Sequence, residues 1–124
     1  MNIPEDLKYT ESHEWVRVQG RQALVGITDH AQAELSDVVY VELPKVGASL
    51  QAGAPAAVVE SVKAAGDIYA PVTGTVAAVN EVLAKNPALV NSDPYGEGWL
   101  FVVELGNPAE VEALKDAAGY RALI

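Results

Sequence analysis

Residues 60–71 read ESVKAAGDIYAP, and the rest of the chain is organised around this stretch and its Lys63. The short apolar run 56–59 precedes it, and a second run, 68–72, continues beyond the small residues that follow the lysine. Two apolar runs joined by small turn residues predict a strand, a tight turn and a second strand. We therefore expect Lys63 at the tip of a hairpin, with no adjacent acid to pair with its ammonium group. Most lysines are simply exposed, so this pattern alone favours an ordinary solvated lysine.

Residues beyond the turn strengthen the argument. Glu60 stands three residues before Lys63, and the stretch continues as ESVKAAGDIYAPVTG, which resembles the lipoyl-lysine hairpin of biotinyl/lipoyl carrier domains. It is similar in particular to the H-protein family of the glycine cleavage system. YTESHEWV at 9–16 and NPALVNSDPYGEGWL at 86–100 also match that family, so the resemblance covers essentially the whole chain. One departure is Gly66, where many relatives carry serine, and it affects only the expected turn geometry.

The resemblance implies a fold and a function. The fold would be mainly β, a barrel-sandwich hybrid with two or three short helices including a C-terminal helix, and residues 1–124 would form a single lipoyl-carrier domain. Lipoate would be attached covalently to Lys63 and supply the chemistry. The arm would shuttle an aminomethyl group from glycine decarboxylase to the tetrahydrofolate-dependent aminomethyltransferase, and dihydrolipoyl dehydrogenase would reoxidise it. The protein would be a carrier substrate and not an enzyme.

Four further residues are candidates for handling the lysine or its arm. Glu60 is expected to be recognised by the lipoate-attaching enzyme, although a simple surface acid is an equally good interpretation. The loaded arm carries a cationic amine on a carbon that is lost if water attacks it, so a partly dry cleft with a carboxylate would protect it. Our candidates for this cleft are Glu14, with Ser12 beside it, and Asp67, close to the lysine. The alternative for Glu14 is a solvated acid at the end of a strand.

The sequence offers no catalytic centre of its own. It has no cysteine, no GxSxG motif and no phosphate-binding loop. The only histidines are His13 and His30, and their spacing does not suggest a metal site, so we expect His30 to cap or solvate its helix. Lys63 has neither the buried apolar setting nor the neighbouring cation that a Schiff-base or general-base lysine requires. We therefore predict no catalytic residue and no metal ligand.

Charge and composition restrict the partners. The 17 acidic residues outnumber the 8 lysines and arginines, which gives a formal net charge of -9. This balance argues against binding to nucleic acid or to an anionic membrane surface. The beginning, MNIPEDLKYT, has no apolar core for secretion and is too acidic for a transit peptide. We expect a cytoplasmic bacterial protein, or less readily a processed mitochondrial one, and a diffusing shuttle favours a monomer.

The remaining elements follow from apolar alternation and capping signals. Further strands are expected at 15–18, 23–27, 38–42, 75–79 and 99–105. Asp29 is expected to cap a short helix, with Gln32 completing a capping box. Asn107 before Pro108 predicts a C-terminal helix that stops near Gly119, followed by a tail that packs back on the domain.

Three alternatives remain open on the sequence. A biotinyl or lipoyl domain of another multienzyme complex would share the hairpin, although biotin carriers usually have methionines where Val62 and Ala64 stand here. A lipoate-relay carrier would have the same modification with an acyl-transfer purpose. An unmodified interaction module would only resemble a carrier.

Overall fold

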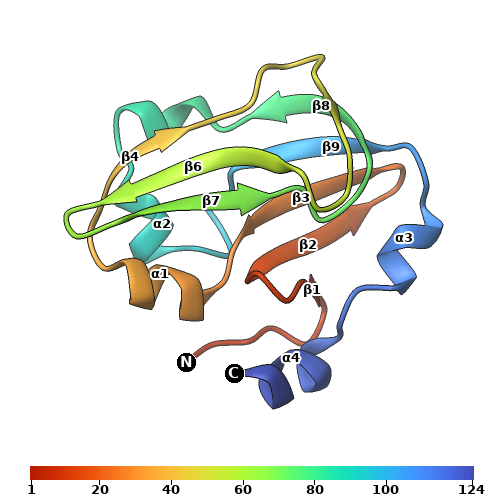
Figure 1. The fold of residues 1–124 in the computed structure, drawn as a ribbon, viewed down its shortest axis with the longest axis horizontal. Coiled ribbons are helices and arrows are strands. Elements are labelled where there is room, and N and C mark those ends of the chain that lie inside the picture. The colour runs from red at the N-terminus through yellow and green to blue at the C-terminus, as the bar shows by residue number, and fades with distance from the viewer.

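Two antiparallel β-sheets make up most of the structure, a computed structural model that describes residues 1–124 (Figure 1). The strands are β1 (Lys8–Tyr9), β2 (Glu14–Gln19), β3 (Gln22–Ile27), β4 (Val38–Glu42), β5 (Ser49–Leu50), β6 (Pro55–Ser61), β7 (Ala65–Tyr69), β8 (Gly74–Val79) and β9 (Phe101–Leu105). The larger sheet has the order β1-β2-β3-β9-β8-β5, and the smaller has the order β4-β6-β7. The predicted mainly β fold is confirmed.

The main hydrophobic core draws on both sheets. In β9 the buried residues Phe101, Val103 and Leu105 alternate with more exposed ones, as expected for a strand with one face on a core. Val25 from β3 and Val59 from β6 are completely buried in the same cluster of 19 residues. The alternating pattern that predicted the strands is thus the pattern that fills the space between the sheets.

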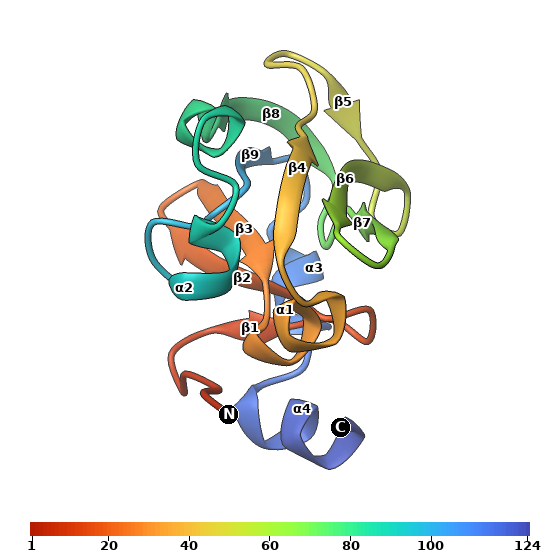
Figure 2. The same cartoon turned by 90° about the vertical axis from the view of Figure 1, so that its left-hand side faces the viewer.

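A second, smaller cluster joins the beginning of the chain to its end. It contains Leu7, Tyr9, Trp15, Ala117 and Tyr120. The rings of Tyr9 and Tyr120 stack with centroids 4.7 Å apart. The two backbone amides of Tyr9 and Lys115 donate to each other's carbonyl oxygens at 2.8 and 2.9 Å. The N- and C-termini accordingly lie at the same end of the molecule (Figure 2).

The helices are short and lie around the sheets. They are α1 (Asp29–Leu35), α2 (Leu89–Ser92), α3 (Ala109–Glu112) and α4 (Ala117–Leu123), with one 3-10 turn, η1 (Glu81–Ala84). Four short α-helices therefore stand where the sequence predicted two or three. None of the helices is long and apolar enough to cross a membrane.

The start of α1 differs by one residue from the prediction. Thr28, and not Asp29, is the N-cap, because its hydroxyl accepts a hydrogen bond from the Ala31 amide at 3.2 Å. Asp29 is the first helical residue, and its Oδ1 accepts from Gln32 Nε2 at 2.7 Å. Its Oδ2 accepts from the Asn2 amide at 2.9 Å, so this carboxylate ties the N-terminal segment to α1.

The predicted C-terminal helix is confirmed, but its expected extent is wrong, because two helices divide this region. α3 ends at Glu112, and Lys115 leaves the helical path to pair with Tyr9. Asp116 then caps α4 by accepting from the Gly119 amide at 2.8 Å. Gly119 therefore lies inside a helix and does not end one, and the residues expected to form a tail continue that helix.

Candidate functional site

Lys63 lies at the tip of the hairpin that joins β6 to β7, as predicted. The two strands pair in register up to Glu60 opposite Ala65, which leaves a short exposed turn. This turn projects from one end of the smaller sheet (Figure 1). None of the three ion pairs in the structure involves Lys63. Its ammonium group is therefore available to another molecule.

Ser61 holds this turn together. Its hydroxyl donates to the Ala64 carbonyl at 3.0 Å and accepts from the amides of Lys63 and Ala64 at 3.3 and 3.1 Å. The Val62 amide donates to the Asp37 carbonyl at 3.0 Å, which fastens the turn to the segment between α1 and β4. Ser61 was not among the residues predicted from the sequence, although serine often forms hydrogen bonds within its own turn.

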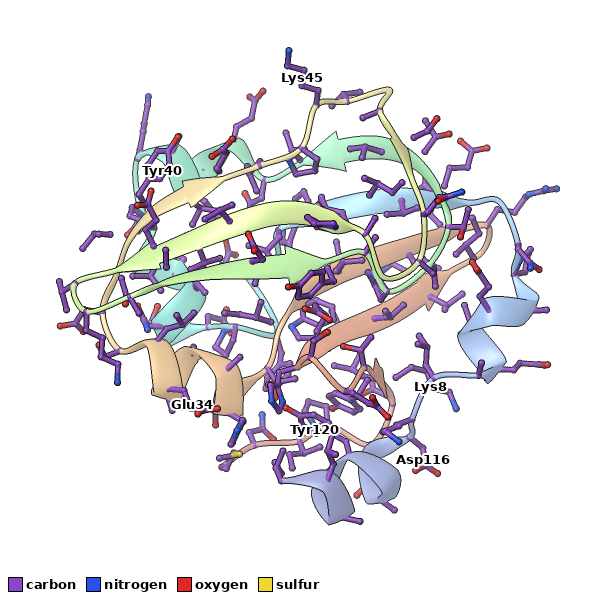
Figure 3. All side chains as sticks on the ribbon, viewed as in Figure 1. Lys8, Glu34, Tyr40, Lys45, Asp116 and Tyr120 are labelled. Carbon is purple, nitrogen blue, oxygen red and sulfur yellow. The ribbon has the colours of Figure 1, made fainter.

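The surroundings of Lys63 are exposed and partly apolar. Glu60 is exposed on β6 and pairs in register with Tyr40 of β4. Tyr40 is 51% exposed and its side chain points outward from the sheet (Figure 3), and Val39 and Val62 are 53% and 68% exposed. A partner that approaches the lysine would therefore meet apolar side chains and one carboxylate.

Glu14 is completely buried at the start of β2. Its Oε1 accepts hydrogen bonds from the hydroxyls of Thr10 and Ser12 at 2.5 and 2.6 Å, and its Oε2 accepts from the Tyr69 amide of β7 at 3.2 Å. The alternative of a solvated strand-end acid is wrong. The structure brings Glu14 and Ser12 together and places Glu14 against the strand that returns from the lysine turn.

Asp67 lies on that same strand. It is exposed and stands two residues before Tyr69, so the two residues share one face of β7. Ile68 between them points to the core. No hydrogen bond joins Asp67 to Glu14, whose contact with this strand is through the Tyr69 amide.

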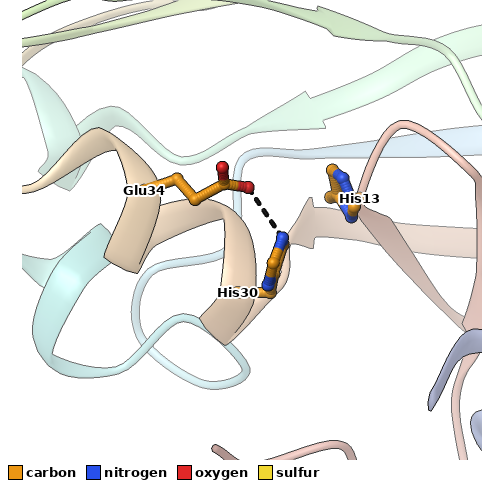
Figure 4. A group of neighbouring side chains, drawn as sticks. All are labelled: His13, His30 and Glu34. Atoms are coloured by element: carbon orange, nitrogen blue, oxygen red, sulfur yellow. Dashed lines mark ion pairs between the residues drawn. The ribbon is translucent and has the colours of Figure 1, made fainter. Parts of the chain in front are cut away.

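A second group of polar residues was not expected from the sequence. His13 and His30 are 17 positions apart, but their ring centroids lie 4.7 Å from each other. His30 Nε2 lies 2.7 Å from Glu34 Oε1 on the next turn of α1 (Figure 4). His13 Nδ1 lies 2.7 Å from the hydroxyl of Tyr120, which also bonds to Thr28 Oγ1 at 2.7 Å. The four-residue spacing of His30 and Glu34 was a sequence signal, whereas nothing in the sequence pointed to His13.

The surroundings of this group alter two pKa values. Burial lowers the pKa of His13, the neighbouring His30 lowers it further, and the carboxylates of Glu34 and Glu14 oppose the change. Burial raises the pKa of Tyr120 to about 12, although its hydrogen bond to Thr28 acts in the other direction. At neutral pH the Tyr120 hydroxyl is therefore protonated, and the His13 imidazole is mostly neutral.

Comparisons with known proteins agree on one family. The family described as "Glycine cleavage H-protein" matches residues 7–124. A glycine cleavage system H protein of Methylacidiphilum infernorum is 58% identical over 124 residues, which are 100% of this chain and 97% of that protein. One of Myxococcus xanthus is 54% identical over 123 residues, or 99% and 95% of the two chains. The crystal structure of a glycine cleavage system H protein from Mycobacterium marinum has a TM-score of 0.88 at 38% identity and covers 97% of each chain.

Proposed function

The chain belongs to the glycine cleavage H-protein family, the lipoyl carriers of the glycine cleavage system, and we propose that Lys63 is the residue that bears the lipoyl group. The carrier is a substrate of the system and not an enzyme. The observation that carries the proposal is the presentation of Lys63 on an exposed turn, without an ion pair and with a backbone held by Ser61. The ligase must reach the Lys63 amine, and the three enzymes must reach the arm attached to it, so both steps need this accessibility.

When attached, the lipoyl dithiolane supplies the chemistry of accepting the aminomethyl group and of redox cycling. The partners would be glycine decarboxylase, the tetrahydrofolate-dependent aminomethyltransferase and dihydrolipoyl dehydrogenase. Tethering the group to Lys63 raises its effective concentration at each partner's active site. The role of this chain is therefore to present, protect and deliver the arm.

The lipoate-attaching enzyme must distinguish Lys63 from the other lysines. Glu60 is the nearest carboxylate on β6, and it is exposed beside Tyr40. An exposed acid at a fixed register from the amine is a feature that a ligase can read through a charge-assisted contact. Glu60 therefore belongs to the recognition surface in this proposal.

Glu14, Ser12 and Asp67 would receive the loaded arm. Asp67 lies four positions after Lys63, or about 13 Å along an extended strand, and Tyr69 lies about 7 Å further. The lipoyl-lysine side chain has about twelve bonds that each advance roughly 1.25 Å, so it reaches about 15 Å. An arm of this length passes Asp67 but ends short of Tyr69, so the exposed Asp67 carboxylate would be the nearer partner for its cationic amine. The buried Glu14 would close the far end of the cleft through its hydrogen bond to the Tyr69 amide.

Residues 1–124 would act as one lipoyl-carrier domain and as a monomer, because a shuttle must diffuse between partners. The relatives named above are bacterial proteins, which supports a place in the bacterial cytoplasm.

The test is an intact-mass measurement of the protein before and after incubation with lipoate, ATP and a lipoate ligase. We expect one lipoyl increment on the wild-type chain and on Lys45→Arg, a control at another exposed lysine. We expect none on Lys63→Arg. Glycine-dependent exchange of labelled CO2 with the decarboxylase then distinguishes glycine cleavage from another lipoyl system. A chain that gains no increment is not a carrier.

A further inference from the structure

Two histidines and a carboxylate that take no part in the proposed carrier function meet between the loop before β2 and helix α1. The ligand atoms of His13, His30 and Glu34 all lie within 4.8 Å of one another (Figure 4). Imidazole nitrogens and carboxylate oxygens are ligands of Zn²⁺ and its neighbouring divalent ions. We propose that His13, His30 and Glu34 form a site for a divalent transition-metal ion, represented by Zn²⁺.

His13 is held in an unusual backbone conformation. Its φ of 73° lies in the left-handed region, which costs an L-residue about 1–2 kcal/mol. Backbone hydrogen bonds from His13 to the Thr10 carbonyl at 3.3 Å and from the Thr28 amide to the His13 carbonyl at 3.0 Å maintain it. This conformation places the His13 ring beside His30. Strain of this kind persists where the surrounding structure imposes it, often at functional sites.

Tyr120 orients the His13 ring. Its hydroxyl occupies Nδ1, which leaves Nε2 of His13 as the nitrogen for a metal ion. The same hydroxyl bonds to Thr28 Oγ1, so its own position is fixed. Metal-bound histidines usually place their second nitrogen in such a hydrogen bond, which sets the ring orientation and the tautomer. Tyr120 is therefore a positioning residue and not a ligand.

The ligand atoms of the three residues would need to move only slightly when an ion binds. Metal–ligand bonds of about 2.1 Å place tetrahedral ligand atoms about 3.4 Å apart. The His30 and Glu34 atoms, now 2.7 Å apart, would open slightly to admit the ion, and the His13 ring would move toward them. The Glu34 side chain is 65% exposed and that of His30 is 25% exposed, so an ion can enter from solvent. Three protein ligands leave a fourth position for water.

The test is calorimetric titration of the full-length, unlipoylated chain with ZnCl2. The chain has no cysteine and only these two histidines, so no thiol or other imidazole competes. We expect one ion per chain, and at least tenfold weaker binding for His30→Asn and for Glu34→Gln. Glu112→Gln, an exposed acid on α3, should bind as the wild type does. Binding that is absent, or that these two variants leave unchanged, overturns the proposal and leaves His30 and Glu34 as a simple helical ion pair.

Two further measurements separate ligation from a general effect on folding. Co²⁺ in place of Zn²⁺ should give the intense visible absorption of a four-coordinate site in the wild type and lose it in His13→Asn. Asparagine tolerates the left-handed backbone, so this variant should keep its fold by circular dichroism. In Tyr120→Phe, the ¹⁵N chemical shifts of His13 in the metal-free protein should lose the signature of one fixed tautomer. Unchanged shifts would show that Tyr120 does not position the ring.

Discussion

The Oε2 atom of Glu14 lies 3.2 Å from the backbone nitrogen of Tyr69 and accepts its hydrogen bond. This contact joins the start of β2 in the larger sheet to the end of β7 in the smaller one. The backbone amide of Tyr69 has this carboxylate as its acceptor, and the carboxylate is shielded from water. A residue proposed to protect the arm is thus also a structural link between the sheets.

Glu14→Ala should destabilise the protein. The substitution leaves the Tyr69 amide and the hydroxyls of Thr10 and Ser12 without their acceptor, and a buried donor left unpaired costs about 1–3 kcal/mol. Urea unfolding followed by circular dichroism measures the loss. Glu11→Ala is the matched control, because its side chain is 81% exposed and should change the free energy of unfolding by less than about 0.5 kcal/mol.

Glu14→Gln should expose the loaded arm at a smaller cost in stability than Glu14→Ala. Glutamine can still accept through its amide oxygen, although its NH2 group then faces one of the donors that Glu14 accepts from. It also removes the negative charge that would attract the cationic amine. We expect the free, loaded carrier to lose its aminomethyl group several times faster than the wild type, measured as formaldehyde release over time. An unchanged rate would remove Glu14 from the proposed cleft.

Ser61→Ala should loosen the lysine turn. Three hydrogen bonds within the turn pass through this hydroxyl, and each exposed bond contributes about 0.5–1 kcal/mol. We expect faster amide exchange at Lys63 and Ala64 and slower attachment of lipoate by the ligase. The total mass increment at the end of the reaction should not change, since Lys63 itself remains.

Alkaline pH should destabilise the smaller hydrophobic cluster, which contains Tyr9 and Tyr120. Burial raises the pKa of Tyr9 above its ordinary value of 10 and that of Tyr120 to about 12. The folded state therefore favours the protonated phenols, so their contribution to stability is complete below pH 10 and is lost as the pH rises toward 12. Absorbance at 295 nm and unfolding measured at pH 9 to 12 follow the change. Tyr9→Phe, which loses the hydrogen bond to the Pro4 carbonyl, should show a smaller loss over this interval.

Two glycines should differ sharply in their tolerance of a side chain. A Cβ on Gly26 would lie 2.6 Å from the buried Trp15 ring, so Gly26→Ala should cost about 1–3 kcal/mol of overpacking. A Cβ on Gly66 would only touch Leu35 Cδ2 at 3.6 Å, so Gly66→Ser should be nearly neutral. Thermal unfolding of both variants tests this contrast. Gly66 lies within β7, whereas the sequence analysis placed it in the turn.

Local pattern was sufficient for the longer strands and the lysine turn, but it missed the two-residue strands β1 and β5. Val38–Glu42 was predicted to the residue, because branched residues and the flanking turn signals agree there. The prediction for the C-terminal region failed because a contact between distant residues determines its structure. Lys115 pairs with Tyr9, a contact between distant positions that outweighs the local helical preference and divides the helix.

The candidate site was predicted only in part, because it too depends on contacts between residues far apart in the sequence. Lys63, Glu60 and Asp67 lie in one hairpin, so their relation follows from the sequence once the hairpin is recognised. The burial of Glu14 depends on Tyr69, 55 positions away, and the approach of His13 to His30 depends on a left-handed backbone and on Tyr120. Contacts of that separation leave no local periodicity to detect.

The paired amides of Tyr9 and Lys115 affect the order in which the chain can fold. Their contact closes more than one hundred residues, and a loop of that length carries a large entropic cost before any contact offsets it. During synthesis from the N-terminus, Tyr9 and Trp15 are made early and remain without the aromatic cover that Tyr120 provides. The last two turns of helix are therefore the step that completes the fold, and a ribosome stalled before Lys115 would hold a chain with its β1 edge still open.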